Sequence, residues 1–514
     1  MNPPSHFVRP IRLRSIALLL VVTLVGPSTA LAQQPEPPNL LAAAVWKYSA
    51  DGGNTFTLDA PTAKAGEVVV AQGSFTVPAP EKIAGLWLAP VVNLVEPEFT
   101  LNGVPAKGLL ANMRYQWFDL DPRQVLKGAD AKLVVRGKMQ AAPPEFKALR
   151  LRSSPASDLV IQTGPAIGHV GPDFVTFSCR TNMAATVTAK VKPLDPASDK
   201  VSETASPRGF YHRLKVAIPA GTKKISYTMT CDSMGASKTS EPVEVTLPDF
   251  SGGKMRFVAA GDSRSNPKHW AAVAAGIEKA APQLLVFSGD LVADGRDDSQ
   301  WDAQFFTPGK SMLARTPFYP APGNHEFDGQ AYFKMCYTPA KEELHSNWSQ
   351  AVGLVLFIGI QGAQDWAPGS ENHKWLDQVL GASKEKYIFL VNHYPAWSSG
   401  KHGNHEGPIV QMRNNVMPLL VKHKATALIG GHDHNYERNE PPANIGVTSI
   451  TTGGAGAPLR RKSNRAAADN PYSKSFAATL HYCVFDLDRE QCVMKVYDVD
   501  GKVIDQCMFA PRLK

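Results

Sequence analysis

Five apolar segments in the second half of the chain each end in a group of glycine, aspartate, asparagine or histidine residues. Aspartate, asparagine and histidine side chains supply the oxygen and nitrogen atoms that bind Zn, Fe, Mn and Mg in proteins. Two such metals, about 3.5–4 Å apart, can hold a phosphoryl group and supply a nucleophilic hydroxide. Because the groups recur at the same place after each segment, we interpret them as parts of one metal site. The groups are Gly261-Asp262, Gly289-Asp290, Gly323-Asn324-His325-Glu326, Asn392-His393 and Gly431-His432-Asp433-His434.

The elements before the first two aspartates predict how these residues meet. Residues 255–260 are apolar, a helical pattern extends from about 269 to 281, and a second apolar run covers 284–288. This order predicts a βαβ unit, in which the carboxyl ends of two parallel strands lie at one sheet edge. We therefore expect Asp262 and Asp290 to point into the same crevice.

The last group places two histidines two residues apart. In an extended segment, the imidazoles of His432 and His434 project to the same side, where they could serve two metals. A carboxylate such as that of Asp290 has two oxygens and can bridge two cations. A histidine that binds no metal could stabilise the transition state or protonate the leaving group.

The order of these groups resembles that of the calcineurin-like metallophosphoesterase superfamily. Its pattern of GD, GD, GNH(E/D), H and GHxH is matched in order over residues 255–510. The closer resemblance is to the purple acid phosphatases and their bacterial relatives. Gly431–Arg438 is similar to their GHxHxYER segment, residues 450–456 to their glycine-rich strand and turn, and His393–Gly407 to their HxPxY…H…EG loop.

The resemblance implies a dinuclear centre of divalent or trivalent ions, with Fe, Zn, Mn and Mg as candidates. Asp290 would bridge the two metals. The first metal would also take Asp262 and His434, and the second would also take Asn324, His393 and His432.

The resemblance also implies residues around the metals. His325 would lie beside the transferring phosphoryl group, and Asn324 would contact the substrate as well as a metal. His402 or His405 would be an acid in the outer part of the site. His402, four residues before Glu406, fits the family loop better, but the spacing leaves both open.

Two positions depart from the family pattern at the first metal. Many members have a histidine two residues after the first aspartate, where this chain has Arg264. The purple enzymes have an iron-binding tyrosine three residues after the second aspartate, where this chain has Ala293. We therefore expect a protein that is not purple, with a weakened or absent first metal. Arg264 would clamp the substrate phosphate through its planar fork, or pair with a local carboxylate.

The N-terminus has the pattern of a secretory signal. Arg9, Arg12 and Arg14 precede an apolar core at 16–26, and the small-x-small site Ala30-Leu31-Ala32 follows. The core is shorter than the roughly 20 residues of a membrane span. We expect residues 1–32 to be a cleaved signal peptide and residues 33–39 a leader. The mature protein would be exported, periplasmic or secreted, without a membrane span.

The remaining chain predicts several domains. Residues 40–150 and 155–250 contain short alternating strands separated by turn residues, a pattern typical of antiparallel sandwiches. The second region would be a fibronectin III-like β-sandwich, similar to the N-terminal domain of purple acid phosphatases. Residues 255–510 would form an α/β catalytic domain, and the resemblance implies two mixed sheets between helices (αββα).

Composition excludes several classes of protein. Of 514 residues, 43% are hydrophobic and 19% charged, as in packed globular proteins. The net charge is +8, and removal of residues 1–32 with three arginines and no acid leaves 8 − 3 = +5. No dense basic block with interleaved aromatics occurs, so we do not expect nucleic-acid binding. The sequence does not indicate an oligomeric state.

Six cysteines in an exported chain permit disulfides. Cys179 could pair with Cys231, and Cys483 with Cys492, or either of the latter two with Cys507. Free buried thiols are the alternative. No CxxC occurs, so a thiolate metal site is not expected.

We therefore interpret the sequence as an exported metal-dependent phosphoesterase. It would hydrolyse phosphate monoesters of a phosphorylated small molecule by metal-hydroxide attack at a dinuclear site. One alternative is a phosphodiesterase with the same site. The other is a catalytically weak protein that binds a surface or glycan, an alternative that Arg264 and Ala293 support.

Overall fold

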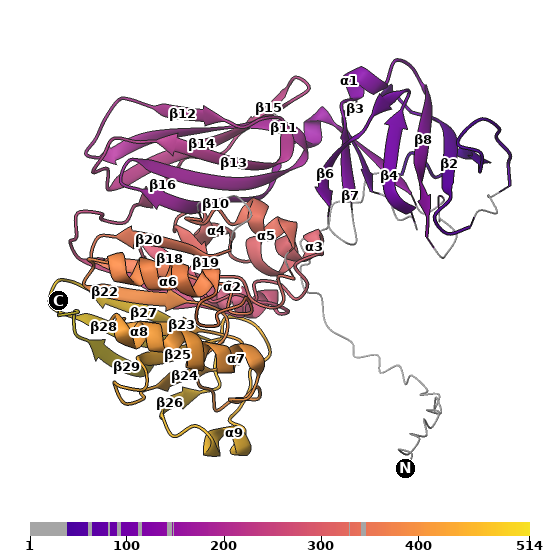
Figure 1. Cartoon of the computed structure of the whole chain (residues 1–514). Helices are drawn as coiled ribbons and strands as arrows, with labels where there is room; N and C mark the ends of the chain where they lie inside the picture. The colour runs from indigo at the N-terminus through magenta and orange to yellow at the C-terminus, as the bar shows by residue number, and fades with distance from the viewer. Residues whose placement is uncertain are drawn as a thin grey trace, which may run out of the picture. The chain divides into compact units, whose positions relative to one another are not determined.

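A computed structural model describes residues 39–513, except 60–63, 81–82, 90–93, 112–115, 141–145, 147–148, 328 and 341–345 (Figure 1). The predicted signal peptide, residues 1–32, and nearly all of the leader lie outside the described residues. Among the helices that are described, none combines the length and apolar character needed to cross a bilayer.

The first part of the described chain consists of two antiparallel sheets. The alternation of buried and exposed residues in β8 (Asp130–Met139) gives the five-stranded sheet one apolar face. Leu133 of this strand and Leu86 of the four-stranded sheet belong to the same buried cluster. The five-stranded sheet has the order β1 (Val45–Ser49), β2 (Val68–Thr76), β8, β4 (Leu94–Leu101) and β5 (Val104–Pro105). The four-stranded sheet has the order β6 (Lys107–Ala111), β7 (Gln116–Leu120), β3 (Ile83–Ala89) and β9 (Arg150–Pro155), with helix α1 (Pro122–Val125) between β7 and β8 in sequence.

A seven-stranded antiparallel sheet follows, organised by one long strand. β11 (Phe174–Asp195) pairs through its first half with β10 (Ile161–Gly171) and β13 (Gly209–Ala217). Its second half pairs with β12 (Ser202–Ala205) and β14 (Lys224–Ser233). Its register with β13 shifts between Arg180 and Ala185, so that one strand serves both ladders. β15 (Ala236–Thr239) and β16 (Val243–Thr246) complete the sheet.

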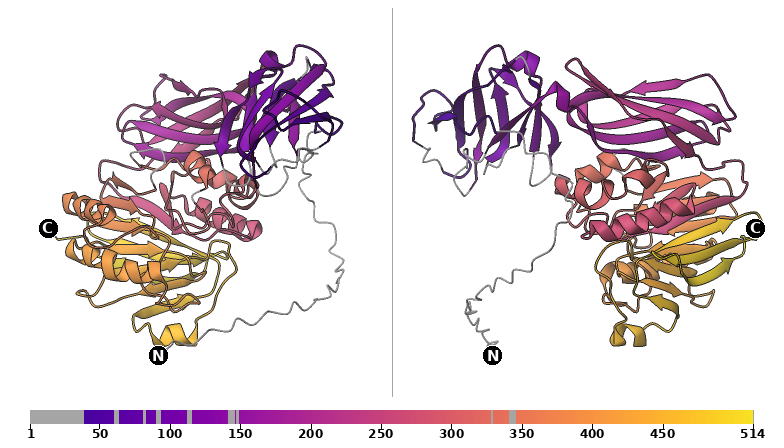
Figure 2. Two further views of the ribbon diagram at one scale, coloured as in Figure 1. Left: turned by 45° about the vertical axis from the view of Figure 1, so that its right-hand side comes forward. Right: turned by 180° about the vertical axis from the view of Figure 1, so that it is seen from behind.

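The remaining chain contains two mixed sheets, shown in Figure 1 and from two further sides in Figure 2. The first has the order β19 (Phe318–Pro320), β18 (Leu284–Phe287), β17 (Met255–Ala260), β27 (His481–Leu487), β28 (Cys492–Asp498) and β29 (Val503–Phe509). The second has the order β20 (Trp348–Val352), β21 (Val355–Gly359), β22 (Tyr387–Val391), β23 (Ala427–Gly430), β25 (Thr448–Thr452), β24 (Tyr436–Asn439) and β26 (Ser473–Ala477). Strands β17, β18 and β19 are parallel, as are β21, β22, β23 and β25.

Successive side chains of β17 lie on opposite faces of the first sheet, as the strand period requires. Phe257 contacts Phe389 of the second sheet, with ring centroids 5.0 Å apart. Val258 joins a different cluster with Trp270 of helix α2 (Pro267–Ala280). The inner faces of the two sheets therefore pack together, and α2 packs on the outer face of the first.

The predicted βαβ unit is confirmed. β17 and β18 are parallel and joined by α2. The helix begins two residues earlier than expected, because the Asn266 side chain accepts the backbone N–H of His269 and Pro267 occupies the first turn. The helix ends at Ala280, and the next residue, Ala281, caps it with a left-handed φ of 49°. This compact connection brings both strand ends to one edge.

The other helical segments connect the strands of these two sheets. Leu376 and Leu390 share a third buried cluster, so α6 packs on the second sheet. The segments are α3 (Asp298–Gln300), η4 (Trp301–Phe306), α4 (Lys310–Leu313), α5 (Gln330–Met335), α6 (Glu371–Ala382), α7 (Gly407–Gln411), η5 (Met412–Val416), α8 (Met417–Lys422) and α9 (Asn464–Ala468).

All six cysteines are free thiols. In the β27–β28 hairpin, Cys483 lies opposite Val496 and Cys492 lies opposite Leu487, so the strand register separates the two thiols. Of the alternatives that the sequence left open, the structure has free cysteines, and five of the six are buried.

Candidate metal centre

Asp262 and Asp290 follow the carboxyl ends of β17 and β18 and meet as expected. Together with His393, which follows β22, they offer ligand atoms that all lie within 4.8 Å of one another. Both carboxylates are almost completely buried. The two sheets therefore contribute to one site at neighbouring strand ends.

Three of the predicted ligands lie on left-handed backbone. The φ angle is 60° at Asp262, 56° at Asp290 and 70° at His432. Aspartate and histidine tolerate this region better than most residues with a Cβ, but each such residue costs about 1–3 kcal/mol. A Cβ on Gly289 would lie 2.5 Å from the backbone nitrogen of Gly323, so the loops after β18 and β19 can touch only with glycine there. The backbone thus turns sharply to aim these side chains at one point.

His393 lies at the centre of the second predicted ligand set. Its Nε2 is 3.0 Å from Asn324 Oδ1, 3.4 Å from Asp290 Oδ1 and 3.1 Å from His432 Nδ1. Its Nδ1 donates to the Ser288 carbonyl at 2.8 Å, so Nε2 carries a lone pair. His432 Nε2 donates to Glu406 Oε2 at 2.8 Å, which leaves a lone pair on His432 Nδ1.

This set fits a metal ion because four acceptor atoms converge with no proton between them. Such a group of lone pairs is unfavourable unless a cation joins them. Burial lowers the pKa of His393 to about 4, so that it is neutral over most of the pH range. A neutral imidazole is the form that binds a metal.

The first predicted ligand set has a different environment. Asp262 Oδ1 is 3.6 Å from His434 Nε2, and His434 Nδ1 donates to the Pro458 carbonyl at 2.8 Å. Burial, followed by the charge of Asp290, raises the pKa of Asp262 well above its usual range. Asp262 Oδ1 is buried and has no hydrogen-bond partner among the described residues.

Arg264 extends into this first set. Its Nε donates to Asp290 Oδ2 at 3.1 Å, and its Nη2 donates to His434 Nε2 at 3.3 Å. Nη1 donates to Ser265 Oγ at 3.3 Å. The local carboxylate that pairs with Arg264 is therefore the predicted bridging ligand itself. The ion pair expected as one alternative for Arg264 is therefore present, and the phosphate clamp stays a prediction.

His325 borders the site without joining either ligand set. Its Nδ1 donates to the Ala293 carbonyl at 2.7 Å, which fixes the ring and leaves Nε2 as an acceptor. Nε2 lies 3.9 Å from Asp290 Oδ2, and a quarter of the side chain is exposed. At this position the His325 side chain can contact a substrate that binds beside Asp290.

Glu326 holds two of the site's loops together. Its buried carboxylate accepts the backbone N–H groups of Asp290 at 3.0 Å and Leu291 at 2.8 Å, and also that of Gly323. Burial and then the charge of Asp290 raise the pKa of Glu326 to about 8. Sequence reasoning included Glu326 in a motif but gave it no separate role. Glu326 therefore positions Asp290 and the loop that contains Gly323 and Asn324.

The structure brings His402 to the site and leaves His405 at the surface. The ring of His402 lies 4.0 Å from that of His432, and its Nδ1 is 3.1 Å from Glu406 Oε2. The side chain of His405 is 72% exposed and pairs with Asp469 at 3.3 Å. Both histidines belong to the same loop, but its path places His402 beside His432 and His405 beside Asp469.

Arg460 is a residue that sequence reasoning missed. Its Nη1 donates to His402 Nε2 and lies 3.3 Å from the His432 carbonyl. It follows the glycine-rich turn after β25 in no pattern that indicated a role. Arg264 and Arg460 thus place two guanidinium groups beside the ligands.

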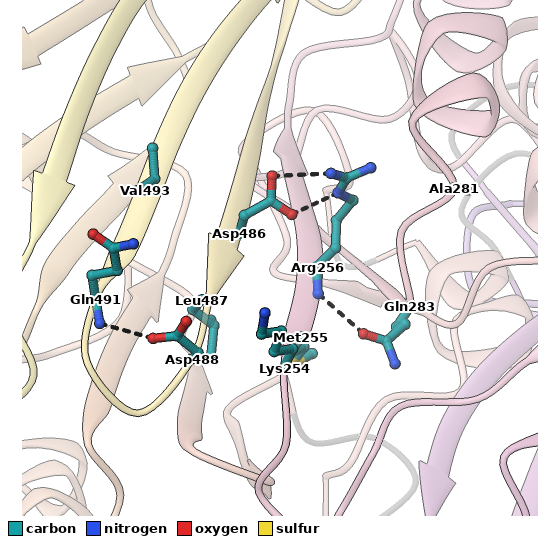
Figure 3. A pocket seen from close by; sticks show the side chains of 10 residues that line it. All are labelled: Lys254, Met255, Arg256, Ala281, Gln283, Asp486, Leu487, Asp488, Gln491 and Val493. Atoms are coloured by element: carbon teal, nitrogen blue, oxygen red, sulfur yellow. Dashed lines mark hydrogen bonds and ion pairs between the residues drawn. The ribbon is translucent and has the colours of Figure 1, made fainter.

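A surface pocket of about 420 Å³ lies away from these residues, at the amino end of β17 (Figure 3). An ion pair between Arg256 Nε and Asp486 Oδ1, 2.7 Å long, forms part of its lining. The candidate metal centre follows the opposite end of the same strand. The pocket is lined by Lys254, Met255, Arg256, Ala281, Gln283, Asp486, Leu487, Asp488, Gln491 and Val493.

Comparison with known proteins finds a family model and several similar proteins. Residues 255–436 match the family model of the calcineurin-like phosphoesterases. The chain is 24% identical over 227 residues to tartrate-resistant acid phosphatase type 5 of Sus scrofa, covering 36% of this chain and 65% of that protein. It is 29% identical over 183 residues to probable inactive purple acid phosphatase 24 of Arabidopsis thaliana, covering 31% of this chain and 29% of that protein. The chain thus spans less than two thirds of either relative.

A solved structure is similar over most of the chain. Purple acid phosphatase PPD1 from seeds of yellow lupin, Lupinus luteus, superposes with a TM-score of 0.60 at 15% identity. The match covers 91% of this chain and 96% of that one. At this identity the likeness concerns the fold.

The fold, the site and the family model together define a calcineurin-like phosphoesterase domain over residues 255–436. The similar proteins include purple acid phosphatases. The resemblance seen in the order of the motifs is confirmed.

Proposed function

We propose that this protein is an exported, metal-dependent phosphoesterase that hydrolyses the phosphate monoester of a small molecule. The convergence of three acceptor atoms on a fourth, His393 Nε2, carries the proposal. A metal bound there would lower the pKa of a water ligand and polarise the phosphoryl oxygens. The acid phosphatase among the relatives supports the monoester as substrate.

The residues around this set have roles that follow from their contacts. His325 is held by the Ala293 carbonyl so that Nε2 faces the side of Asp290. There it can stabilise charge on a transferring phosphoryl group, or carry a proton at Nε2 to the leaving oxygen. Arg460 and Arg264 place positive charge beside the predicted ligands, and this charge would attract an anionic substrate.

His402 is held at both ring nitrogens. Nε2 accepts from Arg460, so Nδ1 carries the proton and donates to Glu406 Oε2. Glu406 accepts from His432 through the same oxygen. His402 therefore acts first as a positioning residue, which keeps Glu406 and hence His432 in place, and can exchange its contact with Arg460 for a contact with substrate.

The two loop histidines provide a matched pair of variants. His402→Ala is expected to lower kcat/KM by about 10–100-fold and to weaken metal affinity, as loss of a partner behind a ligand does. His405→Ala removes an exposed ion pair and should leave both unchanged within about twofold. Steady-state kinetics and metal titration of the two purified variants would compare them. Equal effects of the two changes would contradict the assignment.

Substrate class is tested by comparing two esters. The metal-loaded protein should hydrolyse para-nitrophenyl phosphate faster than bis(para-nitrophenyl) phosphate, and Asn324→Ala should hydrolyse neither. Faster hydrolysis of bis(para-nitrophenyl) phosphate would favour the phosphodiesterase alternative, which uses the same site. No hydrolysis of either ester under any metal would favour the surface- or glycan-binding alternative.

The finer features of fold and location are part of the same proposal. The basic, apolar and small-residue pattern of residues 1–32 supports export, which N-terminal sequencing of the secreted or periplasmic protein would test. The antiparallel strands β10 to β16 support a fibronectin III-like β-sandwich at 155–250. The packed inner faces of the two mixed sheets support an αββα arrangement for 255–510.

A further inference from the structure

The first ligand set already contains a cation. Arg264 donates to Asp290 Oδ2 at 3.1 Å and to His434 Nε2 at 3.3 Å, two of the three side chains that the first metal would use. We propose that the guanidinium of Arg264 replaces the first metal, so that this protein binds a single metal ion, through Asp290, Asn324, His393 and His432.

The guanidinium is held where a metal would have to enter. The backbone N–H of Arg264 donates to the Asp290 carbonyl at 3.3 Å, so the residue is tied to the loop that it contacts. Its side chain is 13% exposed, and Ser265 accepts from Nη1. Two ligand atoms that a metal needs are therefore already engaged by N–H donors, and a second cation beside them would be repelled.

The fourth ligand of a first metal is also missing. Ala293 has no donor side chain, and its carbonyl accepts from His325 at 2.7 Å. The set would be limited to Asp262, Asp290 and His434. Asp262 Oδ1, which has no hydrogen-bond partner among the described residues, is the one oxygen still open to a metal. A metal there would have to displace Arg264 from both of its contacts, and this is the competing outcome.

The inference rests on the proposed function and assigns separate roles to the single metal and to Arg264. The single metal would act on the side of His393 and His432, whereas Arg264 would supply the permanent positive charge on the side of Asp262. Because a guanidinium matches phosphate oxygens with paired N–H donors, Arg264 would hold the phosphoryl group that a first metal otherwise holds.

The test is the number of metal ions per chain. Mature protein is saturated in turn with Zn, Mn and Fe, desalted and analysed by elemental mass spectrometry. We expect one ion per chain. Arg264→His removes the cation and offers an imidazole two residues after Asp262, so this variant is expected to hold two ions. Arg264→Lys keeps a positive charge without adding a ligand, and should hold one.

Two ions per chain in the unchanged protein would overturn the inference, as would two in Arg264→Lys. One ion in folded Arg264→His, with circular dichroism matching the unchanged protein, would also count against it. The count does not depend on hydrolysis. One ion without hydrolysis of either ester would refute the proposed function alone, whereas two ions with hydrolysis would refute the inference alone.

Discussion

The variant Asp290→Asn is expected to lose its bound metal and at least about 10³-fold in kcat/KM, since a metal supplies several kcal/mol of transition-state stabilisation. Asp290 Oδ1 faces His393 Nε2 at 3.4 Å, and Oδ2 accepts from Arg264. An amide has one acceptor oxygen in place of two and no charge. Whichever way it is turned, its NH₂ group faces either the ligand cluster or the guanidinium.

The same change should leave the chain folded but less stable. It relieves the repulsion between Asp262 and Asp290, but it also removes the charge that pairs with the largely buried guanidinium of Arg264. We therefore expect the metal-free variant to melt below the metal-free parent, with a circular dichroism spectrum that matches it. Asp377→Asn, at a surface ion pair with Lys422, is the matched control. Full activity and metal content in a folded Asp290→Asn protein would contradict the proposed centre.

His325→Ala is expected to lower kcat by about 10²–10⁴-fold, the range for a positioned acid–base group. In contrast to Asp290→Asn, it should keep its metal, because His325 Nε2 lies 3.9 Å from the nearest Asp290 oxygen and joins neither ligand set. The two variants therefore separate metal binding from chemistry at the substrate.

Steady-state kinetics and metal analysis on the same preparations would measure this contrast. His269→Ala, at an exposed position in α2, is the control for loss of an imidazole. An unchanged kcat in His325→Ala would remove His325 from the reaction. Loss of metal with loss of activity would instead make it a ligand.

The parts of the site that sequence could predict are those that strand ends determine. Asp262 and Asp290 follow short apolar runs joined by a helix, and the geometry of a βαβ unit leaves one arrangement for them. The same reasoning predicts that His393 and His432 follow parallel strands, as β22 and β23 do. For these residues the local sequence pattern predicts the tertiary position, because the sheet determines where each strand ends.

The parts that sequence could not predict depend on loops. His402 and His405 are separated by two residues, and only the path of their loop turns one toward His432 and the other toward Asp469. Arg264 had two possible partners, and its pairing with Asp290 follows from the contact between two loops. Arg460 has no motif at all. Loop paths are set by many tertiary contacts, which spacing along the chain does not encode.

The left-handed backbone at Asp262, Asp290 and His432 has a consequence for how this protein can diverge. Two requirements limit the residue types at these positions: the side chain must bind the metal, and the residue must tolerate a left-handed backbone. If a gene duplicate lost its activity, selection on the metal would end but selection on folding would continue. Valine, isoleucine or threonine would remain disfavoured there, because branched side chains adopt this conformation poorly. An inactive descendant should therefore accumulate asparagine or glycine at these positions. The places of the former ligands would still be recognisable in its sequence.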